Sequence, residues 1–457
     1  MQTTSTLLRF TTLLVCIGGL AFAADGPVKI EAALANPVML AGAKSPNYLR
    51  VAVTGEKLPD STPRVPLNVS IVIDRSGSMQ GEKIEAAKRA AKSAIERLRP
   101  NDTVSVIAYE TSVNIVQPAI RIDDNSDKAA TTRHQILSAI DTITATGNTA
   151  LFAGVSMGAG EIRKESNLRG GRVNRIVLLS DGLANVGPSS PGELAELGTS
   201  LGREGICVTT LGLGLDYNED LMSKLASASD GNHMFIDSVE ALNRAYAMEF
   251  GDAMTVVARN VNVRIQCASA VRPVRAMGRE AIVDGSSIQM SLGDISVGRT
   301  KYCLIELDVP LIEPEGEHVA AEAEVSYLAA TTNESKTTRS VVRLRHSRSQ
   351  AEVEHQTNKE VMVATVQQIA AERNELALRL RDAGKIEEAR QELESNAAYL
   401  YSNSETFNSE QLRKDGIAND FGSKNLDPEK WKYNRKLQRE YQVGTKKQGV
   451  VLEKSIR

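Results

Sequence analysis

The sequence has few of the motifs on which common enzyme classes depend. Its five histidines are scattered over different expected elements and show no metal-ligand spacing. There is no His-Glu-x-x-His zinc motif and no phosphate-binding loop with Gly-Lys-Ser or Gly-Lys-Thr, and we expect no Gly-x-Ser-x-Gly nucleophile elbow. The segment 212–214 does not complete a dinucleotide fingerprint. These absences weaken hydrolase and nucleotide-dependent functions, so we expect a protein that is not an enzyme.

Strong charge and a cysteine framework are also lacking. The chain has 457 residues, a formal charge of −3 and four cysteines, so nothing in its charge favours nucleic acid as a partner. Cys207 lies in an apolar strand and is expected to be a buried small hydrophobe. Cys267 and Cys303 lie in strand-like segments and either form a disulfide or are buried thiols. The absence of a second pair favours thiols.

The N-terminal segment has the features of a secretory signal peptide. Arg9 precedes an apolar run at 13–22, and residues 21–23 read Ala-Phe-Ala, an A-x-A cleavage site. The run is short for a bilayer-spanning helix, so residues 1–23 are predicted to be removed, with an uncleaved anchor as the alternative. We expect an exported protein, periplasmic, secreted or at the cell surface, with no transmembrane span in its mature chain.

The next part of the chain alternates between helical and strand-like segments. This alternation over 66–251 predicts an α/β domain with a doubly wound, mostly parallel, Rossmann-like sheet. Residues 27–65 alternate like strands and end in a proline-rich break. From 256 to 346 the hydrophobic period changes to two, which predicts an antiparallel β-sandwich. We hypothesise that 27–65 completes this sandwich, so that the α/β domain is inserted into it.

The C-terminal part is predicted to be helical and then polar. Residues 352–402 read as a helical hairpin, broken at Asp382-Ala383-Gly384. Residues 403–457 form a polar tail that becomes basic from Lys424 onward, with interspersed aromatics. We expect this tail to be flexible. Peripheral association with the envelope through its cations is the minority hypothesis.

Oxygen-bearing side chains follow three of the segments in the α/β region. Asp74, Ser76 and Ser78 come directly after an apolar strand, spaced two apart, and Thr149 lies between two helix-like stretches. Asp181 follows a second buried strand. Because ligands bind at the carboxyl ends of parallel strands, these side chains are expected to meet at one sheet edge. Their oxygens suit a hard divalent cation. Each segment alone is better explained as a helix cap or turn, but the three together favour the metal site.

These three motifs, in this order, resemble the von Willebrand factor type A (VWA) domain with its metal-ion-dependent adhesion site. The resemblance covers about 66–250, and the segment 181–187 looks like bacterial members. It implies that Ser76, Ser78 and Thr149 ligate the metal directly or through water. Asp74 and Asp181 would mostly hold coordinating waters. The expected ion is Mg²⁺, with Mn²⁺ or Ca²⁺ as alternatives.

The resemblance implies an exported, metal-dependent protein-binding module for adhesion or assembly. Two hydroxyls and one carboxylate leave a cation short of ligands, so an Asp or Glu of a protein partner would complete the shell. In the family the last helix of the domain, here 239–250, often moves when the metal shell changes. The alternatives are a structural envelope-assembly subunit whose metal site is not essential and, with less support, a metal-dependent hydrolase.

Overall fold

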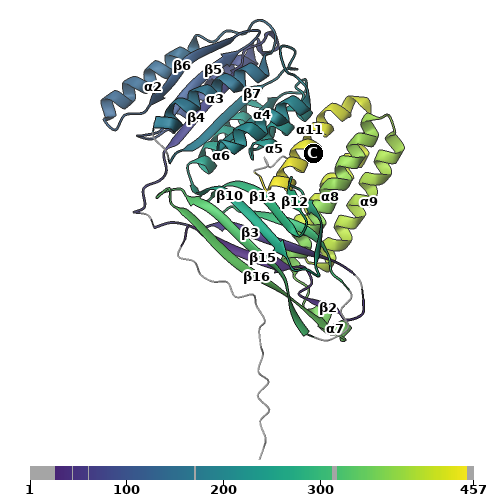
Figure 1. Cartoon of the computed structure of the whole chain (residues 1–457). Helices are drawn as coiled ribbons and strands as arrows, with labels where there is room; N and C mark the ends of the chain where they lie inside the picture. Colours follow the sequence, from purple (N-terminus) through teal and green to yellow (C-terminus); the bar gives the residue numbers. More distant parts are fainter. Residues whose placement is uncertain (1–25, 44, 60, 169–170, 311–315, 450–457) are drawn as a thin grey trace, which may run out of the picture.

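The computed structural model describes residues 26–449 except 44, 60, 169–170 and 311–315. The expected signal peptide therefore lies outside the described residues. Three parts are arranged around one another in Figure 1: an α/β domain, a β-sandwich below it, and a group of helices at their side. Among the described residues no helix combines the length and apolar character needed to cross a membrane.

The α/β domain is built on a six-stranded sheet in the order β6-β5-β4-β7-β8-β9, in which only β6 is antiparallel to its neighbour. Its strands are β4 (Leu67–Asp74), β5 (Thr103–Tyr109), β6 (Val113–Arg121), β7 (Val173–Ser180), β8 (Ile206–Leu213) and β9 (His233–Ile236). Its helices are η1 (Gly77–Met79), α1 (Glu82–Glu96), α2 (Ser126–Asp141), α3 (Leu151–Leu168), α4 (Pro191–Arg203), α5 (Glu219–Ala228) and α6 (Val239–Ala253).

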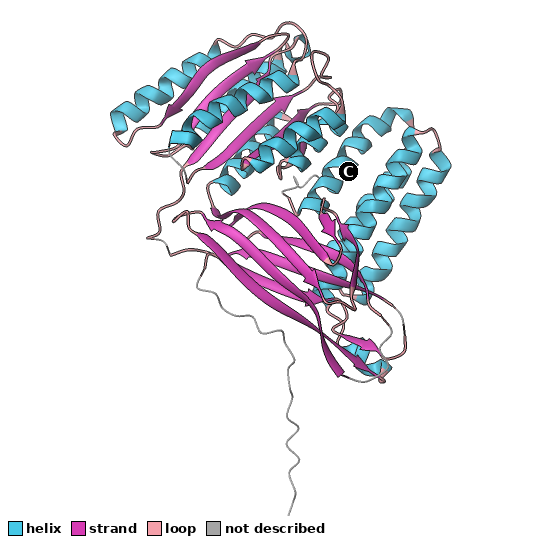
Figure 2. Cartoon of the chain, viewed as in Figure 1, coloured by secondary structure: helices cyan, strands magenta, loops and turns pink. Residues whose placement is uncertain are grey.

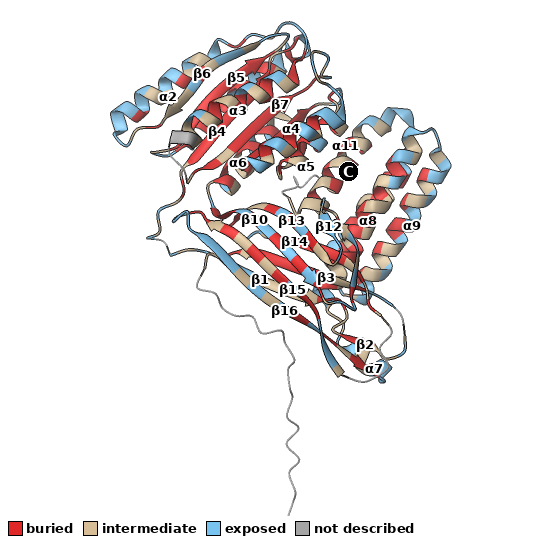
Figure 3. Ribbon diagram, viewed as in Figure 1, coloured by how far each residue is buried: buried red, intermediate tan, exposed pale blue. Residues whose placement is uncertain are grey.

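Helices cover both faces of this sheet, which explains the uninterrupted apolar character of its central strands. Every residue of β4 is buried. Ile71 and Ile73 pack with α1, α2 and α6, whereas Val72 faces the other way and packs with α3, α4 and α5. Figure 3 shows the central strands as continuous buried bands. The predicted doubly wound α/β sheet is confirmed.

The sandwich consists of two antiparallel-rich sheets, ordered β1-β3-β14-β11 and β12-β13-β10-β15-β16-β2. Its strands are β1 (Val28–Leu34), β2 (Val38–Leu40), β3 (Pro46–Gly55), β10 (Val256–Cys267), β11 (Arg272–Met277), β12 (Ile282–Asp284), β13 (Ser287–Ser296), β14 (Thr300–Asp308), β15 (Gly316–Ala329) and β16 (Ser335–Ser347). β3 pairs with β14 along its whole length. The α/β domain is therefore inserted between two strands of the same sandwich.

The sandwich core has the expected alternation. From Val261 to Cys267, buried residues alternate with exposed ones along β10. Cys267 and Cys303 both lie in this core as free, buried cysteines, as expected. Burial raises the pKa of the Cys303 thiol to about 12, so it remains protonated and unreactive at neutral pH.

The predicted helical hairpin is present, with its break at residues 383–385, but the expectation of a flexible tail after it is wrong. The chain continues through α7 (Gln350–His355), α8 (Lys359–Asp382), α9 (Ile386–Thr406), α10 (Glu410–Lys424) and α11 (Pro428–Lys447). In Figure 1, and in the same view in Figure 2, the helices from α8 onward lie side by side, with α11 between the others and the α/β domain, whereas α7 lies apart beside β2. α11 packs on α5, β9 and α8. Only residues 450–457 of the expected tail lie outside the description.

A polar interior explains why the sequence did not reveal α10 and α11. The side chain of Asn374 donates to Gln438 at 2.6 Å and to Asn419 at 3.0 Å, and it accepts from Gln442 at 2.6 Å. All four side chains are buried. A search for apolar periodicity misses helices that meet through amides, although satisfied amides form a stable interior.

The cations of α11 form ion pairs within the chain. The basic residues that we expected in a free tail are therefore part of the folded structure. Arg435 forms ion pairs with Glu219, with Asp220 at 2.6 Å and with Asp382 at 2.8 Å. The ammonium of Lys436 lies 2.7 Å from Glu219. These side chains therefore hold α11 on the α/β domain and are not free to bind an anionic envelope surface.

Candidate metal centre

The candidate centre lies at the carboxyl edge of the parallel sheet. β4 ends at Asp74, its neighbour β7 ends at Ser180, and Asp181 follows. Thr149 lies two residues before the start of α3. Parallel strands end at the same edge, so segments more than one hundred residues apart in sequence meet there. We call Asp74, Ser76, Ser78, Thr149 and Asp181 the metal edge.

Asp74 is fully buried and held by hydroxyl and amide donors. Its Oδ1 accepts from the backbone N–H of Ser76 at 2.8 Å. Its Oδ2 accepts from the Ser180 hydroxyl at 2.6 Å and the Tyr109 hydroxyl at 3.4 Å. Burial raises the pKa of Asp74 and the charge of Asp181 adds to that rise, while the bonds from Ser180 and Ser76 oppose it. A cation beside this carboxylate would favour its charged form.

The two serines link the first motif to Asp181. The Ser76 and Ser78 hydroxyl oxygens lie 3.1 Å apart. Ser78 donates to Oδ1 of Asp181 at 2.7 Å. The other oxygen of Asp181 pairs with the ammonium of Lys83, which comes from the first turn of α1. The fully buried Asp181 therefore has a partner on each oxygen.

Gly182 shows how closely the metal edge converges. A Cβ atom added there would lie 3.1 Å from Thr149 Oγ1, 3.4 Å from Ser78 Oγ and 3.6 Å from Asp74 Oδ2. Three oxygens from two separate segments, residues 74–78 and the loop that carries Thr149, thus lie within 4 Å of a single point on a third segment. Hydroxyl and carboxylate oxygens are suitable ligands for Mg²⁺. The donor set and its convergence fit a small, hard divalent cation.

Hydrogen bonds fix the loops that carry these side chains. The backbone N–H of Gly77 donates to the carbonyl of Gly147 at 3.0 Å, and that of Thr146 donates to the carbonyl of Arg75 at 2.7 Å. The backbone N–H of Thr149 donates to the Asn185 side chain at 2.8 Å. Each of the three segments is therefore tied to another, which preorganises the oxygens without help from a ligand.

The structure brings together all five side chains that the sequence singled out. Sequence reasoning missed Ser180, Lys83 and Asn185, which hold Asp74, Asp181 and the Thr149 backbone respectively. Ser180 ends the strand before Asp181 and was detectable from that position. Lys83 and Asn185 carry no comparable signal, because their partners lie far away in sequence.

Other candidate sites lack support among the described residues. No group of three or more His, Cys, Asp or Glu side chains there is arranged to hold a metal. Gly-x-Ser-x-Gly strings do occur at 154–158 and 198–202, but they lie inside α3 and α4. A nucleophile elbow requires a strand-to-helix turn, so neither string forms one.

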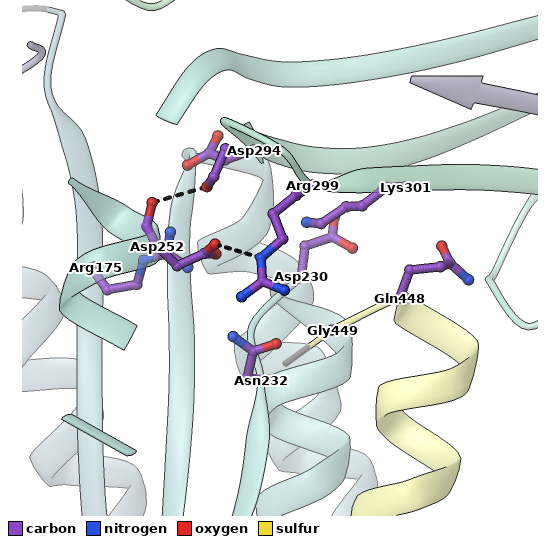
Figure 4. Close-up of a pocket in the computed structure, with 10 residues that line it drawn as sticks. Arg175, Asp230, Asn232, Asp252, Asp294, Arg299, Lys301, Gln448 and Gly449 are labelled. Carbon is purple, nitrogen blue, oxygen red and sulfur yellow. Dashed lines mark hydrogen bonds and ion pairs between the residues drawn. The ribbon is translucent and has the colours of Figure 1, made fainter. Parts of the chain in front are cut away.

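A charged cavity lies where the α/β domain, the sandwich and the end of α11 meet (Figure 4). Its volume is about 20 Å³, which is room for one water molecule. Its lining includes both acids and bases, among them Asp230, Asp252, Arg299 and Lys301. Asp252 and Arg299 form an ion pair at 3.1 Å. This balance marks an interface between parts of the chain.

Comparisons with known proteins agree with this fold. Residues 68–246 match the family model of the von Willebrand factor type A domain. A VWA protein from Catenulispora acidiphila superimposes with a TM-score of 0.68 at 18% identity, over 86% of this chain and 92% of that one. The chain therefore contains a VWA domain, a class of domain that mediates protein–protein interaction.

Two curated relatives are bacterial and uncharacterized. A protein of Synechocystis sp. is 28% identical over 62% of this chain and 66% of its own length. YfbK of Escherichia coli is 29% identical over 55% of this chain and 42% of its own length. The chain therefore spans less than two thirds of either relative.

Proposed function

We propose that this chain is an exported module that binds a protein partner through a divalent cation held at the metal edge. Ser76, Ser78 and Thr149 would hold Mg²⁺ or Mn²⁺ directly or through water, with Asp74 and Asp181 orienting coordinating waters. The bound cation supplies a positive centre that attracts a carboxylate. An Asp or Glu of the partner would complete its shell, and the surrounding loops would give specificity.

The convergence of three oxygens around Gly182 supports this proposal most strongly. A set of helix caps would satisfy each segment locally. Here Ser78 bonds to Asp181, 103 residues away, and no side-chain hydrogen bond caps η1 or α1. The frequent binding of divalent metals by VWA domains points in the same direction. We propose no catalytic step, since the described hydroxyls at the edge have no adjacent histidine base.

Cation titration of the full chain tests the proposal. We expect one saturable Mn²⁺ site by calorimetry in the parent protein and its loss in Asp74→Ala. Asp141→Ala is the matched control, because it removes the same group from an exposed surface pair with Lys92 and should bind like the parent. Unchanged binding in Asp74→Ala would contradict the site.

Partner binding gives the second arm of the test. A partner captured with the parent chain should be released by chelation and should fail to bind Asp74→Ala. Retention of the partner under both conditions would favour the structural assembly role, in which the metal is not essential. Separation of periplasmic, secreted and cytoplasmic fractions of the producing cells would test export.

A further inference from the structure

Lys83 is the cation that the chain itself provides at the metal edge. Its ammonium pairs with Oδ2 of Asp181, while 37% of the Lys83 side chain is exposed and Asp181 is fully buried. Lys83 therefore reaches the buried carboxylate from the solvent side. Arg75, which lies between Asp74 and Ser76 in the chain, is already paired with Glu110 at 3.1 Å.

The position of Lys83 is unfavourable for its own helix. It lies in the first turn of α1, where the helix dipole favours acids and disfavours cations. Glu82 and Glu85 of the same turn match that preference, whereas Lys83 does not. A residue that breaks a local rule in this way is expected where it serves a site, and the partner that compensates for it is Asp181.

We propose that Lys83 competes with the divalent cation for Asp181 and so sets the cation affinity of the site. This inference rests on the proposed function. Asp74 and Asp181 supply the two negative charges of the edge, and Lys83 neutralises one of them. A cation bound among Ser76, Ser78 and Thr149 would be repelled by the nearby ammonium and would face a carboxylate that is already paired.

This competition couples cation binding to partner binding. A cation held weakly by the chain alone gains most from a ligand brought by the partner. The displaced ammonium of Lys83 stays on the solvent side of the site, where an incoming carboxylate would meet it. The two positive groups would then share the partner's acid, and the cation and the partner would strengthen each other's binding.

Mn²⁺ titration of three full-length variants tests the inference. Lys83→Gln removes the charge and Lys83→Arg keeps it. Lys92→Gln is the matched control, since it removes the same charge from the same helix at a surface pair with Asp141. We expect Lys83→Gln to bind Mn²⁺ on the order of tenfold more tightly than the parent. Lys83→Arg and Lys92→Gln should stay close to the parent.

Thermal unfolding with and without Mn²⁺ provides a readout that does not depend on binding heat. Without its partner, Asp181 is buried with one oxygen unpaired, so Lys83→Gln should melt lower than the parent in the absence of cation. It should gain more than the parent when Mn²⁺ is added, because tighter binding stabilises the folded chain further.

The outcomes separate the two proposals. Equal or weaker binding in Lys83→Gln, with saturable binding in the parent, overturns the role of Lys83 and leaves the metal site standing. Binding in Lys83→Gln alone supports both. No binding in any folded variant overturns the metal site, and the role of Lys83 with it.

Discussion

The metal edge and the contact between α11 and the VWA domain, here called the α11 junction, both bring together charged side chains from distant segments. They differ in how far their acids are balanced by cations. At the edge, Asp74 and Asp181 face one described cation, Lys83, together with three hydroxyls. The α11 junction consists of the largely buried cations of α11 and the acids of the VWA domain that they meet: Arg435, Lys436, Arg439, Lys447, Glu219, Asp220 and Asp230.

This difference separates a binding site from a structural contact. The junction pairs each acid with at least one cation, which leaves nothing for a ligand to satisfy. At the metal edge, two carboxylates face one lysine, so an excess of negative charge remains. Three uncharged hydroxyl groups beside them offer further oxygen ligands. Unbalanced charge held in a fixed geometry is a feature of binding sites, whereas balanced pairs hold parts of the chain together.

The largest effect expected at the junction follows from Lys436→Ala. The Lys436 ammonium is buried, lies 2.7 Å from Glu219 and donates to the carbonyl of Tyr217 at 2.9 Å. Burial alone would raise the pKa of Glu219, but Lys436 and Arg435 lower it overall. Loss of one partner of a buried pair costs about 3 kcal/mol. Urea unfolding should show this loss, while the Mn²⁺ affinity should not change.

Lys432→Ala is the control for that variant, since Lys432 lies on the same helix in an exposed pair with Asp216 at 3.8 Å. Its free energy of unfolding should stay within about 0.5 kcal/mol of the parent. A similar loss in both variants would mean that α11 tolerates no substitution, and that the junction pairs are not the cause.

A smaller, pH-dependent effect is expected from Asp230→Asn. Burial alone would raise the pKa of Asp230, but Lys447 and Arg279 lower it to about 2. Its ordinary value is 3.8, so the folded pKa is depressed. The resulting stability is present above about pH 4 and is lost as the pH falls through about 2. At neutral pH it amounts to about 2 kcal/mol.

The measurement is the free energy of unfolding of parent and Asp230→Asn between pH 2 and pH 6. The parent curve should fall toward pH 2 more steeply than the variant curve, so that the two converge in acid. Asparagine tolerates the left-handed backbone at this position, where φ is 57°. Parallel curves would show that the Asp230 carboxylate does not stabilise the junction.

The smallest effect is expected from Gly182→Ala, which changes the spacing of the oxygens at the metal edge without changing any charge. Gly182→Ala places a methyl group 3.1 Å from the Thr149 hydroxyl oxygen, so the converging oxygens have to move apart. We expect about a tenfold loss of Mn²⁺ affinity, or about 1.4 kcal/mol, with little change in stability. Gly160→Ala is the control, because nothing lies within 4 Å of the added Cβ. Equal affinity in both variants would mean that the oxygens do not need this spacing.

The sequence correctly predicted the features that depend on short local motifs and on hydrophobic periodicity. Asp74, Ser76 and Ser78 form one local motif, and the apolar strands before Asp74 and Asp181 placed both aspartates at one sheet edge. Period-two alternation on both sides of the inserted domain predicted that 27–65 joins the sandwich, and the structure shows that β3 does so by pairing with β14. These features depend on neighbouring residues and on the rules of parallel sheets.

The sequence did not predict contacts between distant polar groups. In the sequence, Lys83 looks like an ordinary exposed lysine in the first turn of a helix. Only the fold shows that Asp181 lies beside it. The helices α10 and α11 meet their neighbours through Asn374, Asn419 and Gln438, so their buried faces look hydrophilic. Hydrogen bonds between polar residues that are far apart in the sequence produce no periodic pattern of apolar residues, so they cannot be predicted from such a pattern.

The most direct test of the metal edge is a crystal structure of the full chain grown with Mn²⁺ and measured at the manganese absorption edge. The account predicts an anomalous peak among the hydroxyl oxygens of Ser76, Ser78 and Thr149, within about 2.5 Å of each one that ligates the cation directly. A folded chain with no peak there, or with its peak in the charged cavity lined by Asp230 and Asp252, would contradict it.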